Sequence, residues 1–279
     1  MAKKTVEERR AAGLFWDRAW KLVEGCTKVS PGCDNCWSET ETGMRSCHPN
    51  LKINARAGAV IGGGQGDHYF TGEILMRHDN LNLPTRIKKP TVFAIWNDLF
   101  HKDVDDDFIG EVYNMMFACP QHTFLILTKR AERMGTFLSE VGIEIPDHIW
   151  HGATVCNQEE ADAKIPHLLK VPGKRFLSIE PMLGPIDLTG CLTKPQWGDL
   201  NESDMMPLDI VGRNDLIHQV ILGGESGPGA RPLHPNWVRG VRDQCASAGV
   251  PFMFKQDSGT RPNKLPELDG AKHDSLIWG

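Results

Sequence analysis

Short apolar segments alternate with amphipathic helical segments along most of the chain. Residues 91–96 (TVFAIW) are typical of a buried strand, and residues 105–118 carry apolar side chains at helical spacing. The pattern recurs, and further strands are expected at 19–23, 123–127, 149–155, 175–179, 219–222 and 251–255. Strands that alternate with helices are typical of parallel βαβ units, and about six or seven such units predict an α/β fold with a barrel or a partial barrel.

Two segments interrupt this alternation, at about 43–90 and 184–217. Both are partly rich in glycine or proline, and we interpret them as loops inserted into a single domain that spans residues 1–279. The glycine run at 62–66 is not followed by Gly-Lys-Ser/Thr, so it is not a phosphate-binding P-loop.

Composition and charge limit where the protein is expected to act and what it is expected to bind. The chain has no run of eighteen apolar residues, and its charged amino terminus lacks the apolar core of a secretory signal. These features predict a cytoplasmic protein without a membrane partner. A net charge of −5 disfavours a general nucleic-acid coat, because such a protein would be basic.

Polar residues follow the apolar strands at the points where the strands are expected to end. They are Cys26, Asn97, Asp98, Thr128, Lys129, Thr154, Glu180, Glu225 and Ser226. Active sites in barrel folds lie at the carboxyl ends of the strands, so these residues are candidates for one site.

Three of the eight cysteines lie in one polar loop at residues 25–37, where Cys26, Cys33 and Cys36 have the spacing C-x6-C-x2-C. Three thiolates this close in sequence can bind one metal centre, and iron–sulfur clusters are held by cysteine thiolates. On a four-iron cluster they would leave one iron free for a small molecule. The competing interpretation is a structural zinc site completed by Cys47 or His48.

A third interpretation, ordinary core cysteines, fits poorly with a loop that contains proline, glycine, aspartate and asparagine. It does fit the four scattered cysteines, which we expect to be buried as small apolar residues: Cys119, Cys156, Cys191 and Cys245.

Six segments together resemble the radical S-adenosylmethionine (SAM) superfamily, and most closely a phage and prophage family with an atypical three-cysteine motif. They are 25–36 (GCTKVSPGCDNC), 97–101 (NDLFH), 122–130 (HTFLILTKR), 176–185 (FLSIEPMLGP), 223–232 (GGESGPGARP) and 254–256 (FKQ). The resemblance extends from about Trp20 to Gly270. The chain departs from the superfamily in its first cysteine gap, which is three residues longer than usual, and in Asn35, where an aromatic residue often precedes the third cysteine.

The resemblance implies a partial (β/α)6 TIM-like barrel of the radical SAM type, with a [4Fe-4S] cluster on Cys26, Cys33 and Cys36. SAM would bind the free iron, and electron transfer from the reduced cluster would cleave it to a 5′-deoxyadenosyl radical that abstracts hydrogen from the substrate. Such an enzyme needs an electron donor such as flavodoxin or ferredoxin.

The resemblance also implies roles for individual residues. Those expected to bind SAM are Asn97, Asp98, Thr128, Lys129, Thr154, Glu180 and Glu225, and those expected to reach the substrate are His101, Ser226, Arg231, Lys255 and Gln256. Simpler alternatives stay open: Asn97 and Asp98 can cap a helix, Glu180 can pair with Lys129, and His101 can be structural.

The phage association implies a nucleotide or DNA-base substrate, and the expected reaction is the isomerisation of an amino-acid-modified (glycyl-type) thymidine in phage DNA hypermodification. A base inside a duplex would have to be extruded to meet a buried radical. Two alternatives are a radical SAM DNA-lesion lyase of the spore photoproduct lyase type and a zinc-stabilised nucleic-acid-binding module without catalysis.

Overall fold

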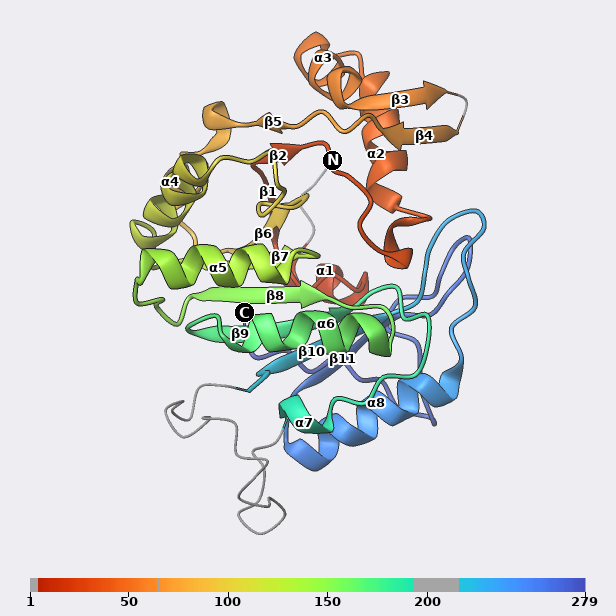
Figure 1. Cartoon of the computed structure of the whole chain (residues 1–279). Helices are drawn as coiled ribbons and strands as arrows, with labels where there is room; N and C mark the ends of the chain where they lie inside the picture. Colours follow the sequence, from red (N-terminus) through yellow and green to blue (C-terminus); the bar gives the residue numbers. More distant parts are fainter. Residues whose placement is uncertain (1–4, 65, 193–215, 279) are drawn as a thin grey trace.

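The computed structural model describes residues 5–64, 66–192 and 216–278. Its main sheet has seven parallel strands in the order β1-β6-β7-β8-β9-β10-β11 and curls into a half-barrel (Figure 1). The strands are β1 (Arg18–Lys21), β6 (Val92–Trp96), β7 (Thr123–Thr128), β8 (Ile149–Thr154), β9 (Lys174–Ile179), β10 (Gln219–Gly223) and β11 (Phe252–Gln256). The predicted α/β class with parallel strands is confirmed.

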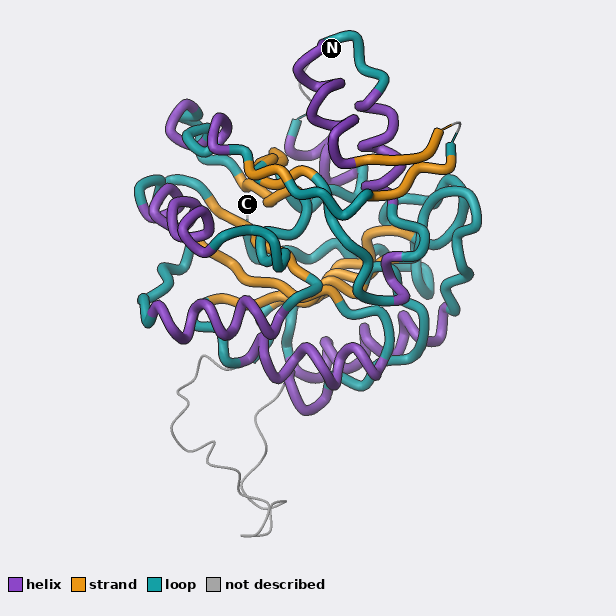
Figure 2. Tube along the Cα trace, turned by 45° about the horizontal axis from the view of Figure 1, so that its top comes forward, coloured by secondary structure: helices purple, strands orange, loops and turns teal. Residues whose placement is uncertain are grey.

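Helices connect the strands and cover one side of the sheet (Figure 2). They are α4 (Asp106–Phe117), α5 (Ala131–Val141), α6 (Gln158–Leu169) and α8 (Pro235–Ala248). Asp105 and Asn157 begin α4 and α6 by accepting hydrogen bonds from backbone N–H groups of the first turn. Within the described ranges, no helix combines the length and the apolar character that a membrane crossing requires.

The short helix α7 (Thr189–Leu192) follows β9. Most of the loop predicted at 184–217 lies outside the described residues.

Alternate side chains of the strands enter two different apolar cores, as the two-residue period of a strand requires. Phe93, Phe124 and Leu177 pack against the helices on the convex side. The concave side buries a second cluster that includes Val92, Leu125, Trp150, Phe176, Ile221 and Met253. Phe15, which follows helix α1 (Val6–Ala11), and Trp278 close this cluster at the amino ends of the strands.

The segment at 43–90 is more regular than the loop that its glycine content predicts. Beside α2 (Trp37–Ser46) it forms α3 (Leu51–Val60), a hairpin of β3 (Ile61–Gly64) and β4 (Asp67–Phe70), β5 (Leu75–Met76), and 3-10 turns at His78–Asn80 and Pro84–Arg86. Asn50 caps α3, and Gly63 makes the hairpin possible with a φ of 80°. A short capped helix and a hairpin each bury few residues, so the apolar pattern alone does not reveal them.

The strand expected at 19–23 is divided between two sheets. Its first part is β1 at the edge of the main sheet, and its end is β2 (Val23–Glu24), which pairs antiparallel with β5. Strand β5 of the inserted segment therefore lies beside the chain that enters the cysteine loop.

Candidate functional site

The three-cysteine loop, residues 25–37, begins at a glycine that no other residue can replace without strain. Gly25 has a φ of 89°, and a Cβ there would lie 2.1 Å from the carbonyl oxygen of Glu73. A turn of 3-10 helix at Pro31–Cys33 follows, and Cys36 directly precedes α2. The loop thereby presents one buried thiol, on Cys33, and two partly buried thiols, on Cys26 and Cys36.

Asp98, directly after β6, is fully engaged by the protein. One carboxylate oxygen accepts hydrogen bonds from the Thr128 hydroxyl at 2.6 Å and from the Phe100 N–H at 3.0 Å. The other accepts from the Lys129 N–H at 3.3 Å and from the Arg130 guanidinium at 2.7 Å. Asp98 therefore ties the end of β6 to the end of β7, and a SAM amino group would have to displace one of these donors.

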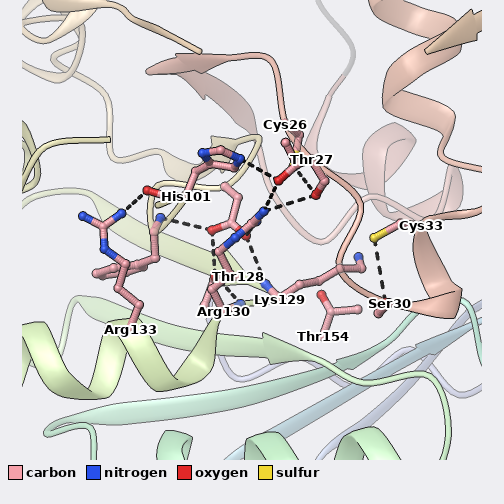
Figure 3. Close-up of polar contacts among 12 residues, drawn as sticks. Cys26, Thr27, Ser30, Cys33, His101, Thr128, Lys129, Arg130, Arg133 and Thr154 are labelled. Atoms are coloured by element: carbon pink, nitrogen blue, oxygen red, sulfur yellow. Dashed lines mark hydrogen bonds and ion pairs between the residues drawn. The ribbon is translucent and has the colours of Figure 1, made fainter. Parts of the chain in front are cut away.

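Arg130 carries this connection into the cysteine loop (Figure 3). Its second guanidinium nitrogen donates to the Thr27 hydroxyl at 2.7 Å and to the Thr27 carbonyl at 3.2 Å. The same hydroxyl lies 2.8 Å from Nε2 of His101, whose Nδ1 accepts from the Asp103 N–H. Burial and the nearby Arg130 lower the pKa of His101, which is 0% exposed. The structural alternative for His101 is favoured over substrate contact.

Asn97 joins the two ends of the cysteine loop. Its amide donates to the Val23 carbonyl at 3.0 Å, and its side-chain oxygen accepts from the Ser38 hydroxyl at 2.9 Å. It adopts a φ of 60°, a conformation that asparagine tolerates better than most residues. Asn97 therefore lies at the expected strand end and connects the residue before the loop, Val23, to the residue after it, Ser38.

Glu225, after β10, holds the other half of the loop through Arg231. Arg231 donates to Glu225 from its backbone N–H, Nε and Nη2, at 2.9, 2.9 and 2.5 Å. The same guanidinium donates to the Asp34 carboxylate at 3.1 Å and to the Pro31 carbonyl at 2.8 Å, and the Asn35 amide donates to Glu225 at 2.9 Å. Burial raises the pKa of Glu225, but the Arg231 and Asn35 hydrogen bonds outweigh burial and hold the pKa below its ordinary value.

Glu180 pairs with Lys255 and not with Lys129. Its carboxylate lies 2.8 Å from the Lys255 ammonium group and accepts from the Ser178 hydroxyl at 3.1 Å. The pair joins β9 to β11 across the concave face. Glu180, which was expected to bind SAM, and Lys255, which was expected to reach the substrate, therefore bind each other.

Gln256 and Ser226 form hydrogen bonds and bridges with the backbone near this pair. The Gln256 amide donates to the Gly224 carbonyl at 2.8 Å and accepts from the Lys264 ammonium group. Ser226 forms a backbone bridge with Gly259. These contacts hold β10 and β11 together, and substrate contacts by either residue stay a prediction.

Lys129 and Thr154 remain available for a ligand. Figure 3 shows the Lys129 side chain extending toward the side of the loop that carries Cys33, with Thr154 nearby. Among the described residues, no hydrogen bond or ion pair is found for the Lys129 ammonium group or the Thr154 hydroxyl. Lys129 is near enough to Cys36 to favour its thiolate electrostatically.

The thiols of the loop do not gather around a single point. Within the described ranges, no three His, Cys, Asp or Glu side chains lie close enough together to bind one metal ion. A cluster makes a different demand, because each thiolate binds a different iron and the ligands stay farther apart. Burial, then the charge of Asp98, raises the pKa of Cys26 to about 11, and burial raises the pKa of Cys36, so the buried surroundings oppose the loss of a proton from both thiols.

A structural zinc site on the loop would lack the fourth ligand expected from Cys47 or His48. Cys36 and Cys47 stand at opposite ends of α2, and a helix of ten residues separates its ends by about 15 Å. Cys47 is exposed, and His48 Nδ1 accepts from the Asn50 N–H. The four scattered cysteines are buried, as predicted: Cys119, Cys156, Cys191 and Cys245.

Two cavities in the described part of the chain lie away from the loop. One of about 240 Å³ is at the amino ends of the strands and is lined in part by Trp16 and Thr123. Another of about 580 Å³ lies beside α4 and α5, near Tyr113 and Phe137. Neither cavity is lined by residues of the cysteine loop.

Sequence reasoning gave no structural role in the loop to five residues that act on it: Thr27, Asp34, Asn35, Ser38 and Arg130. Their signal is position, since four lie within or directly after the loop and Arg130 follows the end of β7. Their partners lie as far as 197 residues away along the chain, which no local sequence pattern reveals.

Comparison with known proteins places the chain in a family. A search of curated proteins and a search of solved structures found no match. The model of one family, described as "Protein of unknown function (DUF5131)", matches residues 13–278, which is nearly the whole described chain. The chain belongs to this DUF5131 family.

Proposed function

We propose that this protein is a radical SAM enzyme whose iron–sulfur cluster is bound by Cys26, Cys33 and Cys36. One observation carries the proposal: a loop with three cysteines is fastened across the carboxyl ends of the parallel strands by Asn97, Arg130 and Arg231. That edge is where catalytic groups of barrel folds gather. On this proposal, the half-barrel is the partial (β/α)6 barrel of the radical SAM type.

A reduced cluster, when bound, supplies the electron that cleaves SAM to methionine and a 5′-deoxyadenosyl radical. The protein's own groups bind and orient. The free ammonium group of Lys129 and the hydroxyl of Thr154 suit the carboxylate of SAM. The Glu180–Lys255 pair offers both an acceptor and a donor to the ligand from the concave face.

The substrate proposed is a modified nucleotide or DNA base, and the reaction is isomerisation of a glycyl-type substituent on thymidine. Trp37 supports an aromatic ligand: it follows Cys36, is 56% exposed, and is held edge-on by Trp96 with ring centroids 4.9 Å apart. An exposed indole that cannot swing freely is a good stacking surface for a base. A DNA-lesion lyase would use the same surface, and flavodoxin or ferredoxin would supply the electron to either.

The test begins with metal. After anaerobic reconstitution, the protein should hold about four irons per chain, as a four-iron cluster requires. Cys26→Ala, Cys33→Ala and Cys36→Ala should each abolish the bound iron and its visible absorption, and Cys47→Ala should retain both. Bound zinc without iron, or loss of the cluster in Cys47→Ala, would refute the proposal.

The second stage measures 5′-deoxyadenosine by chromatography after reduction with dithionite in the presence of SAM. Lys129→Met should weaken SAM binding about tenfold while iron content stays unchanged, because one charged hydrogen bond is lost. Lys102→Met is the matched control, since Lys102 is an exposed lysine paired with Asp103. Absence of 5′-deoxyadenosine from the iron-loaded protein, with and without modified nucleosides, would exclude radical SAM chemistry.

A further inference from the structure

Two arginines attach the cysteine loop to the half-barrel, at two separate places. Arg130, after β7, reaches the loop at Thr27, next to the first cysteine. Arg231, after β10, reaches it at Pro31 and Asp34, on either side of the second cysteine. The two halves of one loop thus depend on two different strands.

Each arginine is itself fixed by a carboxylate at a strand end. Asp98 holds Arg130 at 2.7 Å, and their side chains are only 9% and 12% exposed. Glu225, whose side chain is 3% exposed, holds Arg231 through two guanidinium nitrogens. A planar guanidinium bound in this way has a defined orientation, which a lysine in its place would lack.

The hydrogen bonds of Arg231 leave it little capacity to bind a substrate. Nε donates to Glu225, Nη1 to Asp34, and Nη2 to both Glu225 and Pro31. All three guanidinium nitrogens therefore have partners within the protein. The geometry describes a brace between β10 and the loop.

We propose that Arg130 and Arg231 are positioning residues that hold the three-cysteine loop in its ligand-binding shape before any metal binds. The part of this inference that concerns iron rests on the proposed function, but the shape of the loop does not. A loop that is already ordered loses less conformational entropy when it binds a ligand, so its affinity is higher. Arg231 thereby raises the affinity for the cluster without touching it.

The test uses the full chain, metal-free and reduced, and a probe inside the loop. Lys28 lies between the two attachments, and its half-exposed side chain is a potential trypsin site. Arg231→Gln should speed cleavage after Lys28 and alkylation of Cys33 by iodoacetamide about tenfold, because opening of the loop becomes easier. Both are followed by mass spectrometry.

Arg239→Gln is the control, because Arg239 of α8 also pairs with a carboxylate, that of Asp269, but has no contact with the loop among its hydrogen bonds. It should leave both rates unchanged. Arg231→Lys should restore the wild-type rates only in part, since one ammonium group cannot reach Glu225, Asp34 and Pro31 together. Asp34→Asn removes a single contact from an exposed side chain and should give a smaller increase, which guards against misfolding of Arg231→Gln.

Iron uptake is the second readout. Arg231→Gln should bind iron more weakly than wild type when both proteins are compared at a temperature at which each is fully folded. Wild-type rates of cleavage and alkylation in both Arg231→Gln and Asp34→Asn would overturn the inference, whatever the iron content. A wild-type protein that takes up no iron would refute the proposed function, while the cleavage rates would still decide whether Arg231 holds the loop.

Discussion

The two ends of the half-barrel are closed by different chemistry. At the amino ends of the strands, Phe15 and Trp278 pack on Trp150 and Phe176. At the carboxyl ends, charged side chains and hydrogen bonds hold the cysteine loop. Apolar burial stabilises without demanding one geometry, whereas charged hydrogen bonds are directional. The comparison indicates that one end supplies stability and the other supplies position.

The carboxyl end contains several buried or partly buried ion-pair groups. Asp98 with Arg130 and Glu225 with Arg231 act on the loop itself. Glu24, two residues before Cys26, is 0% exposed and pairs with Arg45 and Arg77. Such groups add little net stability, because charges lose their hydration on burial, but removal of one partner leaves an uncompensated charge.

The largest effect is expected from Trp278→Ala, which tests whether the amino ends of the strands supply stability independently of the loop. Trp278 is 5% exposed and donates from its indole to the Phe15 carbonyl at 2.8 Å. The substitution should lower the free energy of unfolding by about 4 kcal/mol, as expected for a large buried side chain. Urea denaturation measures the loss, and the exposed neighbour Ile277→Ala should change it little. If folded Trp278→Ala also fails to bind iron, the two ends are not separate.

The next effect is expected at the carboxyl end. Glu24→Gln should lower the free energy of unfolding by about 3 kcal/mol, because Arg45 and Arg77 would keep buried charges without their partner. Asp79→Asn is the control, since Asp79 bonds the same Arg77 but is 63% exposed, and it should cost no more than about 1 kcal/mol. Equal losses in the two variants would contradict the importance of burial here.

The smallest expected effect tests whether buried polar groups are confined to the carboxyl end. His151 of β8 is 0% exposed and lies 2.7 Å from the Tyr113 hydroxyl of α4. Burial, then the charge of Arg175, lowers the pKa of His151 from 6.5 to about 3. Below pH 6.5 His151 binds a proton in the unfolded chain but stays neutral in the folded chain. The free energy of unfolding therefore decreases as the pH is lowered.

Between pH 7 and pH 5 this single residue should remove about 2 kcal/mol of stability. His151→Gln should reduce the measured pH dependence by that amount, and His78→Gln, at an exposed histidine, should not. The measurement is urea denaturation at the two pH values. Identical pH dependence in wild type and His151→Gln would show that His151 is not held neutral.

The sequence by itself determined the strands and where they end. The apolar runs of β6 to β11 are visible without a structure, because a buried parallel strand needs consecutive apolar residues. Parallel strands bring their carboxyl ends to one edge, so Asn97, Asp98, Thr128 and Glu225 were predictable as neighbours of Cys26. The spacing of the cysteines made the loop the candidate site.

Only the tertiary structure decided which of these neighbours bond to each other. Glu180 meets Lys255 and not Lys129, and Arg231 meets Asp34, 197 residues away in the sequence. Strand periodicity fixes the face and the edge on which a side chain lies, but its partner depends on how far the sheet curls and on where the inserted segment places the loop. Ion pairs form over a few ångströms, a distance set by packing across the whole sheet.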